Sequence, residues 1–369
     1  MKKTYLLLLL AAAIAAISSL LVPQSAQAQS ATHPRGMVVQ IKAPLGLPPV
    51  PIPADNPPTA ETISLGRRLY FDPILSADGS VSCATCHAPG RGFTDNKPVS
   101  NGVEGKTGSR NSPTVINSAY SPLQFWDGRA PNLEEQAKGP IANPVEMAYT
   151  LDGAVKALQH DASYREDFQK AWGTDQITID LVAKSIASFE RTVLGGNSPF
   201  DRYYYAGDKK AMSPSAVRGL KMFMDANKGN CAACHTVDKK YALFSDGKFH
   251  NVGVGVDLNG NFADTGRFAV SKNVTDTGAF RTPTLRNIAQ TAPYMHDGSL
   301  KTLKDVIDHY IGGGNSNPHL DRQIKVLDFL SGQERADLEA FLNSLTGELP
   351  ASVAPPLPAE KKTAQLSRK

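Results

Sequence analysis

Apolar side chains recur at the spacing of one helical face in two stretches of the chain. In the first, Thr178 has the position of a helix cap and precedes five apolar residues on one face: Leu181, Val182, Ile186, Phe189 and Val193. In the second, Ser331 and Glu334 form a capping box before an apolar face that Gly347 ends: Leu338, Phe341, Leu342 and Leu345. Strict alternation of apolar and polar residues, which is typical of strands, is scarce. The pattern predicts a mainly helical protein with long loops.

The chain also repeats itself. A segment that begins at Leu65-Gly66 leads to Cys83-Ala84-Thr85-Cys86-His87, and a similar segment at Arg218-Gly219 leads to Cys231-Ala232-Ala233-Cys234-His235. Downstream, several residues recur at a constant offset of 170: Pro113 and Pro283, Asn117 and Asn287, Asp127 and Asp297. Two helical domains of related design account for this repeat. We expect them over residues 61–200 and 201–347, with the boundary where the pattern breaks near residues 197–212.

The two ends of the chain differ from these domains. Two lysines, an apolar run over residues 6–22 and an Ala-x-Ala site at residues 26–28 predict a secretory signal peptide over residues 1–28. The alternative is an uncleaved membrane anchor, because the run could just span a bilayer. We expect an exported, periplasmic protein that is not inserted in the membrane after cleavage. The proline-rich residues 29–60 predict an extended lead-in, and residues 348–369 predict a disordered tail.

Composition and charge exclude several classes of protein. The 369 residues carry 39 Lys and Arg against 35 Asp and Glu, a net charge of +4, and 41% of them are hydrophobic. These values are ordinary for a soluble globular protein and exclude a collagen-like, low-complexity or multi-span membrane chain. A charge of +4 over this length gives no support for a nucleic-acid partner.

All four cysteines lie in the two Cys-x-x-Cys-His motifs. This pattern is the attachment signature of c-type haem. Two thiols three residues apart on one helical turn can each form a thioether to a porphyrin vinyl group, and the adjacent histidine then faces the iron as its proximal ligand. Local disulfides or a zinc site are the alternatives, which two copies in an exported chain disfavour. We therefore expect two covalent haems, held by Cys83, Cys86 and His87 and by Cys231, Cys234 and His235.

The sixth coordination position of each iron, opposite the proximal histidine, decides which chemistry each haem can perform. No histidine lies between His87 and Trp126, where the distal loop of the first domain is expected. The second repeat offers Tyr310, and the position 170 residues earlier is Pro140, whose side chain cannot bind a metal. The duplication therefore suggests one haem with a second protein ligand and one without. An open iron site suits small-molecule chemistry, whereas a closed one suits electron storage.

Three strings of residues resemble the bacterial diheme cytochrome c peroxidase family over residues 60–345: Arg110-Asn111-Ser112-Pro113-Thr114, Gln124-Phe125-Trp126-Asp127-Gly128-Arg129-Ala130 and Pro293-Tyr294-Met295-His296-Asp297-Gly298. Ordinary members carry a blocking histidine where this chain has Val103, and an axial methionine where it has Tyr310. Both departures resemble the MauG-like branch, which implies a second haem with His–Tyr ligation. The alternative for Tyr310 is a core aromatic residue.

The resemblance implies roles for further residues. Trp126 matches a tryptophan between the two haems and is a candidate electron relay; the alternative is a large core aromatic. Gln136 and Glu146 match distal-pocket residues of the first haem, with Glu146 as the candidate acid–base for peroxide; the alternative for Glu146 is a surface acid. The resemblance also implies one calcium ion between the domains, bound by three residues: Asn111, Thr291 and Pro293.

Together these features predict a periplasmic diheme oxidoreductase that reacts with hydrogen peroxide at the haem of His87. Its second partner would be a protein, either a small c-type cytochrome or cupredoxin that donates electrons, or a protein whose residues are oxidised. The alternative is a plain electron-transfer cytochrome without a substrate of its own. That alternative requires six-coordinate iron in both haems, and the chain has no distal histidine near the first.

Overall fold

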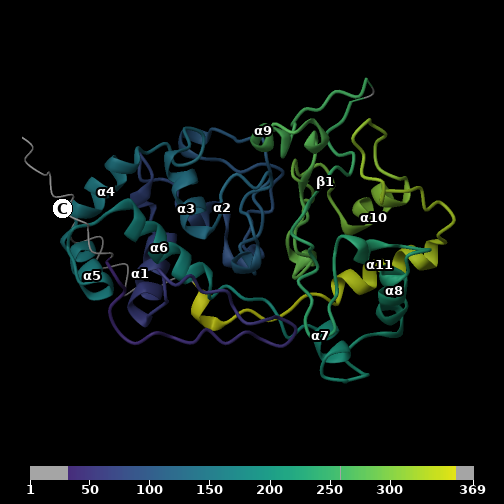
Figure 1. The fold of residues 1–369 in the computed structure, drawn as a ribbon, viewed down its shortest axis with the longest axis horizontal. Coiled ribbons are helices and arrows are strands. Elements are labelled where there is room, and N and C mark those ends of the chain that lie inside the picture. Colours follow the sequence, from purple (N-terminus) through teal and green to yellow (C-terminus); the bar gives the residue numbers. More distant parts are fainter. Residues whose placement is uncertain (1–31, 258, 355–369) are drawn as a thin grey trace, which may run out of the picture. The chain divides into compact units, whose positions relative to one another are not determined.

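The structure, a computed structural model, describes residues 32–354 apart from Leu258 (Figure 1). The predicted signal peptide and the last part of the predicted tail, residues 355–369, lie outside this range. No helix among the described residues is long and apolar enough to span a membrane.

Helices make up most of the regular structure in this range. The two-stranded antiparallel sheet of β1 (Phe249–His250) and β2 (Phe280–Arg281) is small. The helices are α1 (Ala60–Phe71), α2 (Cys83–Cys86), α3 (Leu133–Ala142), α4 (Leu151–His160), α5 (Ala162–Trp172), α6 (Ile179–Glu190), α7 (Pro199–Tyr204), α8 (Pro214–Met224), α9 (Phe268–Ser271), α10 (Leu303–Ile311) and α11 (Gly332–Asn343). The predicted fold class, mainly helical with long loops, is confirmed.

The first core forms where α1 crosses α6. Thr178 caps α6 as predicted, because its hydroxyl accepts a hydrogen bond from the N–H of Leu181 at 3.3 Å. The apolar face predicted for this helix is buried throughout. At the crossing, Gly66 touches the backbone of α6 so closely that a Cβ there would lie 1.8 Å from the carbonyl oxygen of Ser185. Only glycine allows the two helices this approach.

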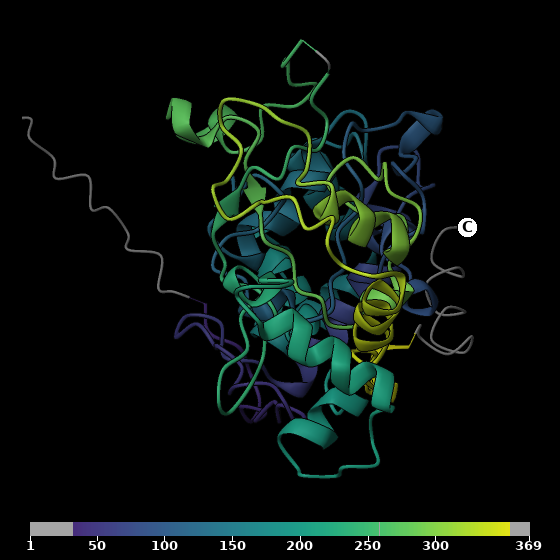
Figure 2. The same ribbon diagram turned by 90° about the vertical axis from the view of Figure 1, so that its right-hand side faces the viewer.

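The second core repeats this arrangement with α8 and α11, which Figure 2 shows side by side. A Cβ at Gly219 would lie 1.9 Å from the carbonyl oxygen of Asp337. The predicted capping box at Ser331 and Glu334 is present. Helix α11 ends at Asn343 rather than at Gly347, and at this end the Ser344 hydroxyl donates to the Phe341 carbonyl at 2.6 Å.

The internal repeat is visible in the backbone. Asn117 and Asn287 both adopt left-handed conformations, with φ of 62° and 58°. Their side-chain amides donate to equivalent carbonyls, that of Gly195 at 2.9 Å and that of Gly347 at 3.1 Å. The duplication that the sequence predicted therefore extends from the helices into the loops.

The segments outside the two cores pack against them. Residues 33–59 contain no helix, and Leu45 accepts a hydrogen bond from Asn197 at 2.9 Å. Residues 348–354, which we expected to be disordered, are ordered. Val353 is 3% exposed within the core of the first domain, and the carbonyl of Ala354 accepts from Nε of Arg67 at 2.9 Å. The prediction was wrong for these residues because Val353 supplies an apolar anchor that composition alone hides.

Candidate functional site

The first Cys-x-x-Cys-His motif forms one helical turn directly after α1. Helix α2 holds both thiols, which are free, and a capping box between Ser82 and Thr85 fixes its start. His87 follows at the end of the turn, and its Nδ1 lies 3.3 Å from the carbonyl oxygen of Phe93. This contact engages Nδ1 and leaves Nε2 for a metal.

The second motif has the same plan on a 3-10 turn, Cys231–Ala233, again with free thiols. Nδ1 of His235 lies 2.8 Å from the carbonyl oxygen of Phe244. Burial lowers the pKa of both His87 and His235, so both rings are neutral, the form that binds iron. Burial also raises the pKa of Cys83 and brings that of Cys231 to about 12.

These two turns fit covalent haem. In each, two free thiols are held about one helical turn apart and a neutral histidine is oriented through Nδ1. Phe93 and Phe244 both have a positive φ, 57° and 51°, which turns their carbonyl groups toward the histidine rings. The donor sets therefore match the c-type haem attachment that the motifs predicted.

Glu146 lies near the first motif, in the loop after α3. Its Oε1 accepts a hydrogen bond from Nδ2 of Asn143 at 2.7 Å. Burial raises the pKa of Glu146, against the opposing effects of that hydrogen bond and of Arg129. The carboxylate in turn contributes to the raised pKa of both Cys83 and Cys86, behind burial as the main cause. Glu146 is thus half-buried beside the first pair of thiols and is not a surface acid.

The two positions that lack a ligand lie on this side as well. Val103 is 3% exposed, and its N–H donates to the carbonyl of Glu146 at 2.8 Å. Pro140 is the eighth residue of α3, the helix that also carries the half-buried Gln136. Neither Val103 nor Pro140 offers a side-chain atom that could bind iron.

Tyr310 lies in the corresponding place in the second domain. It is the eighth residue of α10, which begins at Leu303, 170 residues after the start of α3 at Leu133. Burial raises the pKa of the Tyr310 phenol, and the thiols of Cys231 and Cys234 add to the rise. The phenol is therefore close enough to the second pair of thiols to interact with them electrostatically.

Trp126 links the two domains through the main chain of Asn111. The indole Nε1 donates to the Asn111 carbonyl at 2.9 Å, and the Asn111 N–H donates to the carbonyl of His296 at 2.7 Å. The His296 ring stacks on Phe280 with centroids 3.6 Å apart. A short path of bonded and stacked groups therefore runs from the first repeat into the second.

Comparison with known proteins agrees with this geometry. Residues 60–210 match the family model of di-haem cytochrome c peroxidase, and residues 216–346 match that of cytochrome c. The chain is 40% identical over 311 residues to the methylamine utilization protein MauG of Methylophilus methylotrophus. The aligned region covers 84% of this chain and 89% of that protein. The chain belongs to the di-haem cytochrome c peroxidase and MauG family.

Two further relatives support the assignment of this chain to the di-haem peroxidase family. Cytochrome c551 peroxidase of Pseudomonas aeruginosa is 40% identical over 312 residues, covering 84% of this chain and 85% of that one. The crystal structure of a MauG-like protein associated with microbial copper homeostasis superposes with a TM-score of 0.75 at 34% identity, covering 85% and 96% of the two chains. The predicted family is confirmed, and the protein is a peroxidase-type oxidoreductase with two haems.

Of the three residues predicted to bind calcium in this di-haem peroxidase, Asn111 contacts the loop at Lys97, and the other two belong to a segment that also contacts this loop. Nδ2 of Asn111 donates to the carbonyl of Lys97 at 2.8 Å. The preceding residue, Asn96, donates to the carbonyls of Gln290 and Ala292 at 3.0 and 2.9 Å, next to Thr291 and Pro293. Asn111 and the two carbonyls that flank Thr291 therefore contact adjacent residues, Lys97 and Asn96.

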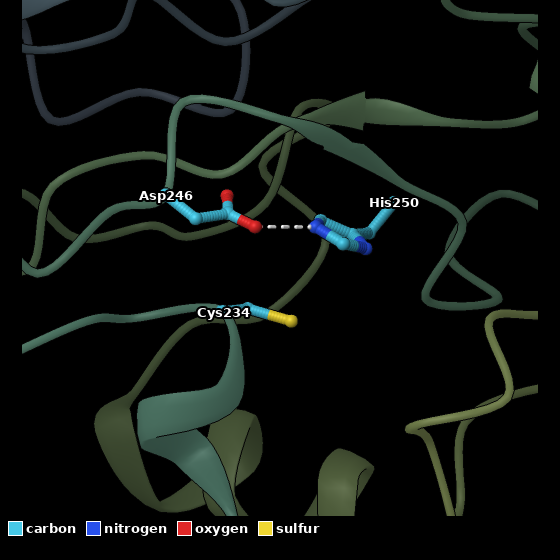
Figure 3. Close-up of side chains that lie close together, drawn as sticks. All are labelled: Cys234, Asp246 and His250. Atoms are coloured by element: carbon cyan, nitrogen blue, oxygen red, sulfur yellow. Dashed lines mark hydrogen bonds and ion pairs between the residues drawn. The ribbon is translucent and has the colours of Figure 1, made fainter.

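Sequence reasoning missed a charged cluster beside the second motif (Figure 3). Nε2 of His250 lies 3.0 Å from Asp246, its Nδ1 lies 2.5 Å from Asp321, and the Cys234 sulfur is close by. Asp321 is 71 residues away in sequence, so no local motif could have revealed the contact. Both ring nitrogens are engaged by carboxylates and Cys234 is predicted to form a thioether, so the cluster does not fit a metal site.

Proposed function

We propose that this di-haem peroxidase reduces hydrogen peroxide at the haem held by Cys83, Cys86 and His87, and takes the electrons from a protein through the haem of the second domain. Peroxide, two electrons and two protons give two molecules of water. When bound, the haems supply the redox chemistry of both steps. The observation that carries the proposal is the difference between α3 and α10, since Pro140 occupies the position at which the repeat has Tyr310.

In this proposal Glu146 moves the proton between the two oxygens of peroxide. A general base within reach of peroxide takes a proton from one oxygen and returns it to the other as the bond between them breaks. Burial favours the neutral carboxyl and the Asn143 amide orients it at 2.7 Å, so the group can both accept and release a proton. Gln136, on the proposed distal side of the same haem, supplies a neutral polar group to the peroxide site.

The second domain supplies the electron store. Cys231, Cys234 and His235 hold its haem, and we propose Tyr310 as the second iron ligand. A phenolate is a hard anionic donor and stabilises oxidised iron, which suits a haem that retains oxidising equivalents. The hydrogen bond of Trp126 to Asn111, and that of Asn111 to His296, support Trp126 as the relay between the two haems.

The oxidised partner is a protein. Relatives named as peroxidases and relatives named MauG match the chain about equally, which supports two classes of partner. One is a small c-type cytochrome or cupredoxin that donates electrons, and the other is a protein substrate whose residues are oxidised. The signal-peptide pattern supports a periplasmic location. The contacts around Lys97 support a calcium ion bound by three residues between the domains: Asn111, Thr291 and Pro293.

Cyanide titration of the fully ferric protein tests the proposal. Cyanide binds only an iron with an open or easily vacated position, so we expect one cyanide for every two haems. Binding of none would mean that both irons are capped, as an electron-transfer cytochrome requires. Tight binding of two would contradict the role of Tyr310 as a ligand.

A further inference from the structure

The two proximal histidines differ in one contact although their surroundings repeat. Thr114 and Thr284 donate to equivalent carbonyls, those of Gly92 and Leu243, at 2.7 and 2.8 Å. The next residue in each loop is a phenylalanine of positive φ. Yet Nδ1 of His235 lies 2.8 Å from its phenylalanine carbonyl, whereas Nδ1 of His87 lies 3.3 Å from its own.

Arg286 stands beside the shorter contact, and the equivalent position 170 residues earlier is Ile116. The guanidinium Nε donates to the carbonyl of Ala242 at 2.6 Å, two residues before Phe244. With Thr284 on Leu243 and His235 on Phe244, three consecutive carbonyls of this segment accept hydrogen bonds. An isoleucine cannot donate, so the first domain lacks this long-range side-chain bond. The equivalent carbonyl there, that of Arg91, accepts only from its own loop, from the hydroxyl of Thr94 at 3.0 Å and from its N–H at 3.2 Å.

Arg286 holds this segment rigidly because its guanidinium group is also bound on its other side. It is 1% exposed and forms a bidentate pair with Asp201, at 2.8 and 2.9 Å. Nη2 also donates to the carbonyl of Gly46 at 2.6 Å. Gly46 has φ of +88°, and a Cβ there would lie 1.9 Å from Oδ1 of Asp201, so only glycine lets the lead-in close over the pair. Buried charge-assisted bonds in a fixed fork are strong and directional.

We propose that Arg286 is a positioning residue for the proximal histidine of the second haem. It fixes the segment from Ala242 to Phe244 so that the Phe244 carbonyl holds Nδ1 of His235 at short range. A stronger hydrogen bond at Nδ1 makes the imidazole a better donor to iron and favours the oxidised state. The inference rests on the proposed function and deepens it, because it gives the duplicated haem sites different reduction potentials through their proximal sides as well as through Tyr310.

The test measures both haem midpoint potentials by spectroelectrochemistry in the holoprotein. The variant is Arg286→Met with Asp201→Asn, which removes both charges and leaves no unpaired buried carboxylate. The matched control is Arg218→Met with Asp337→Asn. This pair is also bidentate, at 2.7 Å for both bonds, and joins α8 to α11 in the same domain.

We expect the potential of the second haem to rise by about 59 mV, a tenfold change in its one-electron equilibrium, and that of the first haem to stay unchanged. The control should lower thermal stability and leave both potentials as in the wild type. Unchanged potentials in the folded double variant, with two haems per chain, would overturn the role of Arg286. A wild type without two distinct haem midpoints would instead contradict the proposed function.

Two further measurements keep the inference testable if the double variant does not fold. Arg286→Lys keeps the positive charge but loses the planar guanidinium group that donates two parallel hydrogen bonds. We therefore expect a smaller rise in the potential of the second haem, and no rise would overturn the inference. In the wild type, NMR should show slower deuterium exchange of the Nδ1 proton on His235 than on His87. Equal exchange of the two protons would overturn it as well.

Discussion

The N–H of Val103 donates a hydrogen bond to the carbonyl of Glu146, with 2.8 Å between nitrogen and oxygen. The position at which ordinary members of the family are expected to carry a blocking histidine is therefore in direct contact with the proposed acid–base residue. Close packing reinforces the contact, because a Cβ at Gly102 would lie 2.1 Å from the carbonyl oxygen of Val145. The two loops hold a buried valine beside the proposed site of peroxide.

Val103→His should convert the first haem from open to capped. In the proposed arrangement an imidazole at this position would supply the distal ligand that Val103 lacks, so cyanide binding to the ferric protein should fall and peroxide should react only after reduction. Burial of a polar ring at a position 3% exposed should also cost about 1–3 kcal/mol of stability. Val103→Leu is the control, and it should keep cyanide binding. A histidine variant that binds cyanide like the wild type would contradict the placement of Val103 on the distal side.

Glu146→Gln should lower kcat/KM for peroxide by about 10²–10⁴-fold, the usual contribution of a positioned proton-transfer group. Haem content should not change, because the amide keeps the size of the side chain. Glu135→Gln, on the exposed side of α3, is the matched control and should be neutral. Steady-state peroxide consumption measures both. Wild-type activity in the Glu146 variant would exclude its catalytic role.

The pH dependence follows from the direction of the Glu146 shift. Burial raises its pKa above the ordinary value of 4.5, and only the ionised form can take a proton from peroxide. The rate of the peroxide reaction should therefore fall as the pH drops through this raised pKa, and Glu146→Gln should remove that acid limb. Stopped-flow measurements across pH compare the two proteins. An identical limb in both would assign it to another group.

Tyr310→Phe should leave both haems attached and open the second iron. Removing the phenol oxygen removes the proposed ligand and keeps the ring, whose centroid lies 5.5 Å from that of the His309 ring. We expect cyanide binding to increase from one to two per chain and the reduction potential of the second haem to rise. Tyr294→Phe serves as a control because its hydroxyl donates to the Ile288 carbonyl. A Tyr310 variant with unchanged peroxide chemistry would remove Tyr310 from the mechanism.

Gly219→Ala should destabilise the second domain. The added Cβ would lie 1.9 Å from the Asp337 carbonyl, so α8 and α11 must separate. Overpacking of this kind costs about 1–3 kcal/mol, which thermal unfolding of the holoprotein can measure. Gly332→Ala, at the start of α11 where nothing lies within 4 Å of the added Cβ, should be neutral or slightly stabilising. Equal melting temperatures for the two variants would contradict the close crossing.

Local patterns in the sequence predicted the motifs, the duplication and the caps at Thr178 and Ser331, because each depends on residues a few positions apart. The contacts that distinguish the two sites are not local. Arg286 meets Asp201 and Gly46 across 85 and 240 residues, and His250 meets Asp321 across 71. A prediction from the constant offset could have compared Arg286 with Ile116, but only the fold shows that the arginine is buried beside the loop of His235.

The ordered residues 348–354 illustrate the same limit. Proline and alanine are common there, which is typical of a disordered tail. The deciding residue is Val353, whose burial depends on a core assembled from residues hundreds of positions earlier. Composition describes the segment correctly and still cannot predict the surface on which it docks.

Low-temperature EPR of the fully ferric protein, repeated directly after peroxide is added without reductant, tests the proposed chemistry most directly. One open and one capped iron should give a high-spin and a low-spin signal, and both should lose intensity when peroxide is added, because oxidation reaches both haems. Two low-spin signals that peroxide leaves unchanged would contradict this expectation. In that case both irons are capped, and Val103 and Pro140 do not mark an open site.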